Sequence, residues 1–118
     1  MFDDVLGGIL ATVVGARCVV LAGRDGVVVA AAVAEDGPAP DVVAASLASL
    51  FRDVATAHRD AGLAPPKEFA SRGAVEQAAI REVTPEYLLI AVVHRDASLG
   101  RLRFELGKAA TAVEPELL

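Results

Sequence analysis

The pattern of apolar residues is most regular between residues 84 and 113. Tyr87 to Val93 is an uninterrupted apolar run, which is typical of a strand buried on both faces. Thr84-Pro85-Glu86 before this run indicates a turn, and Ser98 after it is placed to cap a helix. The next apolar residues recur at helical spacing: Leu99, Leu102, Leu106, Ala109, Ala110 and Val113. The pattern therefore predicts a central strand followed by a helix that covers it.

The first forty residues predict a helix and a β-hairpin. Apolar residues between positions 2 and 14 fall on one helical face, and Gly15 is expected to end that helix. Arg17–Ala22 and Val27–Ala34 are rich in small and β-branched apolar residues, which favour strands. Asp25-Gly26 between them is a strong hairpin signal, and residues 35–40 have the composition of a loop.

A long helix is predicted over Val42–Ala61, with Asp41 as its N-cap and Gly62 beyond its end. We expect its apolar stripe to face the sheet; this stripe contains Val43, Leu47, Leu50, Phe51 and Val54. The opposite surface is small and weakly polar, with Ala45, Ser46, Ala48, Ser49, Ala55, Thr56 and Ala57. Solvated helix faces usually carry Lys and Glu, so this surface indicates packing against a neighbouring molecule. The alternative is that alanine is simply common in this sequence.

A second hairpin is predicted from Lys67–Ser71 and Val75–Val83, with a turn at Arg72-Gly73. Polar residues interrupt its apolar pattern, as expected for strands near a sheet edge. The order of elements is therefore helix, two strands, helix, three strands, helix. We expect the first and fifth strands in the middle of the sheet and helices on both of its faces.

Length and composition narrow the class of protein. A chain of 118 residues predicts one domain, residues 1–118. Sixteen acidic and eleven basic residues give a net charge of −5 without a basic stripe, which argues against nucleic-acid binding. The longest apolar run is far shorter than the ~20 residues of a membrane span, and the acidic start lacks the basic region of a signal peptide. A single Cys18 excludes an internal disulfide, so we expect a cytoplasmic protein.

Candidate chemistry is sparse. The sequence contains no phosphate-binding glycine motif and no G-x-S-x-G, and Gly23-Arg24-Asp25-Gly26 fits a hairpin turn better than an anion site. His58 and His94 lie on different elements without metal-ligand spacing, and Cys18 in an apolar strand is expected to act as a small hydrophobe. We therefore predict no catalytic residues, no cofactor and no metal site, so the chain is not expected to be an enzyme.

The element order and residues 98–110, SLGRLRFELGKAA, resemble the Roadblock/dynein-light-chain superfamily, particularly its bacterial MglB-type members. The hairpin 21–32, LAGRDGVVVAAA, and the helix opening Leu99-Gly100-Arg101 match that family's pattern. The resemblance covers about residues 2–114. It implies an α+β fold with a five-stranded antiparallel sheet in the order 2-1-5-4-3. The second helix would cover one face of the sheet, and the first and last helices the other.

The resemblance also implies a function. Family members dimerise by pairing their third strands and packing their second helices side by side, and MglB-type members regulate a Ras-like small GTPase. On this basis we expect a homodimer interface at Ala45, Ala48, Lys67, Phe69 and Ser71. The GTPase would contact the polar positions of the second helix: Ser49, Arg52, Asp53, Thr56 and Arg59. Arg24 is the one arginine on a protruding loop, and instead of an inserted arginine we expect the dimer to select the GTPase's competent switch conformation.

Two alternatives remain open. The chain could be a structural adaptor that joins a signalling complex without changing GTP turnover. It could also be a small-molecule sensor, because PAS-like and profilin-like folds have similar layers, although the Ala- and Val-rich core offers few polar groups for a pocket.

Overall fold

The computed structural model describes residues 1–118. In it β5 (Tyr87–His94) is the central strand of a five-stranded antiparallel sheet. β1 (Ala16–Gly23) and β4 (Glu76–Thr84) flank it, while β2 (Val28–Val33) and β3 (Glu68–Arg72) form the two edges. The order β2-β1-β5-β4-β3 confirms the predicted sheet and the central position of the first and fifth strands.

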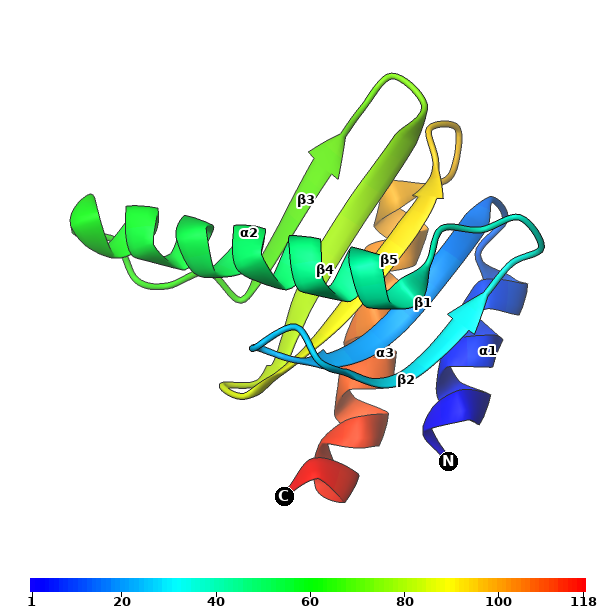
Figure 1. Ribbon diagram of the computed structural model, residues 1–118, viewed down its shortest axis with the longest axis horizontal. Helices are drawn as coiled ribbons and strands as arrows, with labels where there is room; N and C mark the ends of the chain where they lie inside the picture. Colours follow the sequence, from blue (N-terminus) through cyan, green and yellow to red (C-terminus); the bar gives the residue numbers. More distant parts are fainter.

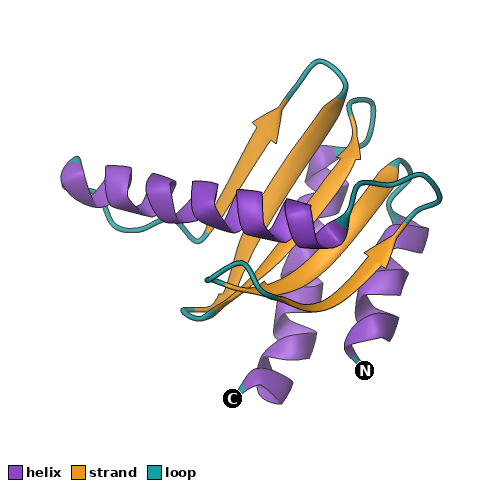
Figure 2. Ribbon diagram, in the orientation of Figure 1, coloured by secondary structure: helices purple, strands orange, loops and turns teal.

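The helices form a layer on each side of the sheet (Figures 1 and 2). α2 (Pro40–Asp60) crosses one face, and α1 (Phe2–Thr12) and α3 (Leu99–Leu117) lie against the other. The uninterrupted apolar runs of β1 and β5 follow from this arrangement, because alternate residues face opposite layers. In β1, for example, Val19 and Leu21 belong to the core under α1 and α3, whereas Cys18 and Val20 belong to the core under α2.

A buried glutamine fixes the loop that leads from β5 into α3. The Nε2 group of Gln77 donates hydrogen bonds to the carbonyl oxygens of His94, Arg95 and Ala97, at 3.3, 3.1 and 2.9 Å. The Ser98 hydroxyl then accepts from the backbone N–H of Arg101 at 3.1 Å, which confirms the predicted N-cap of α3. The polar residue that interrupts the predicted strand therefore has a structural role in the interior.

Three predicted boundaries differ from the structure. α1 ends at Thr12, because Val13 has an extended backbone conformation and its side chain is buried in the core. Gly15 therefore does not end the helix; it supplies a positive φ of 89° in the turn into β1. α2 begins at Pro40, and its N-cap residue is Ala39 instead of Asp41. Asp41 therefore lies in the first turn, and no side chain caps the helix. The turn between β3 and β4 spans residues 73–75 and is closed by a hydrogen bond from Gly73 N–H to the Glu76 carbonyl.

No helix is both long and apolar enough to span a lipid bilayer.

Candidate interaction surface

α2 is held on the sheet by a narrow row of residues. Of its 21 residues only Ala44, Ala48 and Phe51 are buried, and all three lie in its first 12 positions. The small alanine side chains let the helix backbone approach the strands closely, and Phe51 is the only large side chain of α2 that is fully buried. The last turns of α2 extend past β3, beyond the edge of the sheet (Figure 1). Much of this helix is therefore available to a partner.

The predicted core stripe of α2 is confirmed only in part. Phe51 is buried, and Val43 and Leu47 are half-buried and pack against the core under α2. Val54 is half-buried and Leu50 is 38% exposed, and neither belongs to that core. Ala44, Ala48 and Phe51 form a row with the same helical spacing as the predicted stripe, shifted by one residue along the chain. This shifted row faces the sheet most directly. The larger residues lie on the adjacent flank of α2. This flank, defined by Val43, Leu47, Leu50 and Val54, is called the apolar flank below.

A groove lies beside the N-terminal half of this flank. It has a volume of about 420 Å³ and separates α2 from the β3–β4 hairpin. Val43 and Leu47 line one wall, and Ser71, Glu76 and Ala78 line the other. The apolar flank therefore continues onto the open sheet surface.

β3 is the sheet edge next to this surface. It pairs only with β4, in a register that sets Phe69 opposite Ile80 and Ser71 opposite Ala78. Phe69 packs into the core under α2, so the alternating residues Phe69 and Ser71 share the sheet face that α2 covers. Two of the expected dimer residues thus lie together with α2, beside backbone groups that have no strand partner.

Ala48 is a correction to the expected dimer interface. It is 0% exposed in the isolated chain, because it packs against the sheet beneath α2, and a second copy cannot contact it. Ala45 is exposed but lies on the other flank of α2, where a Cβ built on Gly26 would come within 3.0 Å of its Cα. Ala45 therefore packs near the β1–β2 turn rather than toward β3.

A charged cluster joins α2 to the strands at this end of the sheet. Glu82 on β4 accepts from Arg24 at 3.1 Å and from Lys67 at 3.2 Å, and its side chain is only 14% exposed. The Arg24 guanidinium also lies 5.2 Å from the ring centroid of Phe51, and the Arg24 carbonyl accepts a hydrogen bond from Arg52 of α2. Arg24 is thus held in place within the fold. Glu82 could not be predicted as a functional residue, since no local pattern connects positions 24, 67 and 82.

The five expected partner-binding residues of α2 are all exposed. Ser49 and Asp53 point away from the sheet, since they lie opposite the buried row on the helix. Arg52, Thr56 and Arg59 occupy the flank nearer the β1–β2 turn, where Arg59 lies 3.4 Å from the Thr56 hydroxyl. The structure therefore gathers these residues on one accessible side of α2, apart from the apolar flank.

The other titratable candidates have local structural contacts. His58 Nδ1 donates to the Val54 carbonyl at 2.9 Å within α2, and His94 Nδ1 accepts from the backbone N–H of Asp96 at 3.2 Å. Cys18 is fully buried, and its burial raises the pKa of the thiol above the ordinary value of 9.0. No group of three or more His, Cys, Asp or Glu side chains is arranged to hold a metal ion.

Comparison with known proteins identifies the fold through solved structures. No protein-family model matches the sequence, and no curated protein matches it significantly. An MglB with a tetrameric arrangement superposes with a TM-score of 0.88 at 26% identity, covering 97% of this chain and 85% of that one. The gliding protein MglB of Thermus thermophilus gives 0.87 at 25% identity, over 97% and 86% of the two chains. A Roadblock/LC7 domain of Streptomyces avermitilis gives 0.88 at 19% identity, over 98% and 96%. The chain has a Roadblock-superfamily fold of the MglB type.

Proposed function

We propose that this chain is a homodimeric regulator of a Ras-like small GTPase, acting through the exposed side of α2. The observation that carries the proposal is the structure of α2 itself, within an MglB-type fold. This helix has a single buried row, an apolar flank beside an open strand edge, and a separate polar side. One helix therefore offers two different surfaces, one suited to a second copy and one to another protein.

The proposed dimer uses β3 and the apolar flank. Antiparallel pairing of two β3 edges would satisfy their free backbone groups and bring the two copies of α2 alongside each other. Leu50 and Val54 would then be covered, together with Phe69 and Ser71 of β3. Lys67, just before β3, belongs to the same proposed interface, whereas Ala45, on the other flank of α2, lies outside it. The likeness to an MglB with a tetrameric arrangement is consistent with self-association.

The proposed GTPase site is the polar side of α2, formed by Ser49, Arg52, Asp53, Thr56 and Arg59. A GTPase is accelerated either by an added arginine or by ordering of its own switch loops. Arg24 is engaged by Glu82 and Phe51, and extending it into a partner would break both contacts. This supports the second route, in which the dimer binds the hydrolysis-competent switch conformation.

Light scattering tests the proposal in two steps. The chain alone is expected to have twice its mass of 12.1 kDa, and Leu50→Asp is expected to reduce this to a monomer, since a charge on the apolar flank would be buried unpaired. Phe104→Asp is the matched control, because Phe104 is an exposed apolar residue on α3, away from the proposed interface. A wild-type monomer at high protein concentration would contradict the proposed dimer.

The second step adds a Ras-like GTPase loaded with GDP or with a GTP analogue. We expect added mass only with the analogue, faster GTP turnover, and loss of both with Asp53→Arg but not with Glu114→Arg on α3. Binding that ignores the nucleotide and leaves turnover unchanged would instead support the adaptor alternative.

A further inference from the structure

The second sheet edge, β2, lacks the features that usually prevent an edge strand from pairing. It lies at the opposite side of the sheet from β3 and pairs only with β1. Residues 26–34, GVVVAAAVA, contain no charged or polar side chain and no proline, whereas edge strands are commonly protected by lysine or proline. Val27, Val29 and Val33 are 65%, 45% and 38% exposed. This edge is therefore an apolar strand open to a further strand.

The backbone of β2 presents unpaired groups at defined positions. The Ala34 N–H donates to the Arg17 carbonyl at 2.9 Å. This bond identifies which residues of β2 are hydrogen-bonded to β1 and which have backbone groups that face outward. Hydrogen bonding alternates along an antiparallel pair, so Ala31 and Val33 direct their N–H and C=O groups away from β1. A bulge near Leu21 and Ala22 limits this regular edge to residues 30–33. The free edge is short but has both donors and acceptors.

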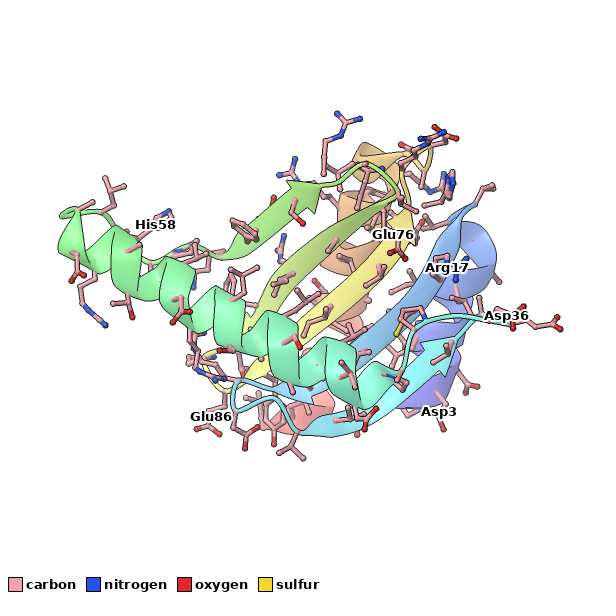
Figure 3. The ribbon with its side chains drawn as sticks, turned by 45° about the horizontal axis from the view of Figure 1, so that its top comes forward. Asp3, Arg17, Asp36, His58, Glu76 and Glu86 are labelled. Atoms are coloured by element: carbon pink, nitrogen blue, oxygen red, sulfur yellow. The ribbon has the colours of Figure 1, made fainter.

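Acidic residues stand at both ends of this edge. Asp25 precedes β2, while Glu35 and Asp36 follow it, and all three are exposed. Figure 3 shows Asp36 beyond one end of β2, Glu86 beside the β1–β2 turn at the other end, and Asp3 on the neighbouring helix α1.

Basic side chains near β2 only partly offset these carboxylates. Arg24 pairs with Glu82, whereas Arg17 and Arg52 donate to the backbone carbonyls of Asp36 and Arg24 and keep their charge. The exposed carboxylates of Asp25, Glu35, Asp36 and Glu86 outnumber these two charges, so the surroundings of this apolar edge are net negative.

This charge pattern disfavours a second copy as the occupant. Two β2 strands paired antiparallel about Ala30, so that the outward backbone groups of residues 29 and 31 meet, would set Asp25 of each copy opposite Glu35 of the other. Like charges directly opposite each other destabilise a strand pair. We propose that the β2 edge instead binds an extended apolar segment of another protein that carries Lys or Arg on both flanks, and adds it to the sheet as a further strand.

This site is independent of the proposed dimer and GTPase site. The strand order places β2 and β3 at opposite edges, so a dimer through β3 leaves β2 free on each protomer. Failure of either proposal therefore leaves the other standing.

The test uses a synthetic peptide of alternating Val and Thr with two Lys at each end, and a matched peptide with Glu in place of Lys. Both are titrated into the ¹⁵N-labelled full chain and followed by NMR. We expect the Lys peptide to bind at least about fivefold more tightly, since each exposed charge pair contributes modestly and several act together. The amide signals of Ala31 and Val33 should shift most and gain protection from hydrogen exchange. Shifts confined to β3 or α2, or equal affinity for the two peptides, would overturn the proposal.

Two variants make the test specific. Val33→Lys places a repelling charge on the edge and should weaken binding of the Lys peptide about fivefold, whereas Val75→Lys in the β3–β4 turn should not.

Glu35→Lys combined with Asp36→Asn should remove the preference for Lys. Asn is chosen because residue 36 has a positive φ of 59° that Asn tolerates. Glu114→Lys combined with Glu116→Gln on α3 changes the net charge by the same amount and is the control for net charge. An unchanged preference in the double variant would refute the role of these carboxylates, and self-association abolished by Val33→Lys would assign the edge to a second copy.

Discussion

The row of α2 that faces the sheet can be tested by comparing two adjacent truncations, Phe51→Ala and Leu50→Ala. Phe51 is fully buried, with Val20, Ile80 and Ile90 in the same core, whereas Leu50 is 38% exposed. Hydrophobic periodicity alone assigns both residues to the core. The structure assigns only Phe51, so the two variants should differ strongly.

The magnitude follows from burial. Removing a buried phenylalanine side chain costs about 3–5 kcal/mol, from lost transfer free energy and the cavity that remains. Loss of the contact between Phe51 and the Arg24 guanidinium adds about 0.5–1 kcal/mol, partly offset by the higher helix propensity of alanine. We expect a net loss of about 4 kcal/mol, which is a large part of the ~5–15 kcal/mol stability of a typical domain. Leu50→Ala should cost about 1 kcal/mol within one chain, because much of its side chain is already in water.

Urea unfolding at several protein concentrations measures both losses. The Phe51→Ala loss should be the same at every concentration, since the cavity lies within one chain. Any additional loss in Leu50→Ala should grow with concentration, because a dimer interface stabilises the native state by mass action. Equal losses for both variants at the lowest concentration would refute this placement of α2, as would a Phe51→Ala loss below about 2 kcal/mol.

Three further predictions follow from buried polar contacts and from the thiol. Gln77→Leu should destabilise the chain by about 2–4 kcal/mol in urea unfolding, because three carbonyls of the β5–α3 loop lose their donor; a loss below 1 kcal/mol would contradict that role. Arg24→Ala should lower stability by about 1–2 kcal/mol through loss of the Glu82 and Phe51 contacts, whereas a freely protruding arginine would leave the melting temperature unchanged. The free energy of unfolding should fall as the pH rises above the ordinary thiol pKa of 9.0, because the unfolded chain releases the Cys18 proton there while the native chain, with its raised pKa, retains it. Cys18→Ala should remove this part of the pH dependence, and an unchanged alkaline slope would show that the thiol does not contribute.

The elements that depend on local pattern could be predicted from the sequence. The apolar run of β5, the Asp-Gly turn between β1 and β2, and the Ser98 cap of α3 each follow from short-range preferences that the fold does not override. The element order then limited the sheet to few arrangements, and the resemblance to Roadblock proteins selected the observed one. The exposed polar side of α2 was also predictable, since it lies opposite any reasonable apolar stripe.

The contacts that build the surfaces were decided only by the tertiary structure. Two adjacent rows of α2 share the same helical spacing, and hydrophobicity favours the row with Leu47 and Leu50. The sheet instead buries Ala44 and Ala48 completely, while Leu47 is only half-buried and Leu50 stays 38% exposed, because close approach of helix and strands gives more contact than larger side chains held further away. Glu82 likewise meets Arg24 and Lys67 only because β4, β3 and the β1–β2 turn converge beneath α2. Periodicity reports which positions are apolar, whereas three-dimensional packing decides which of them are covered and which remain for a partner.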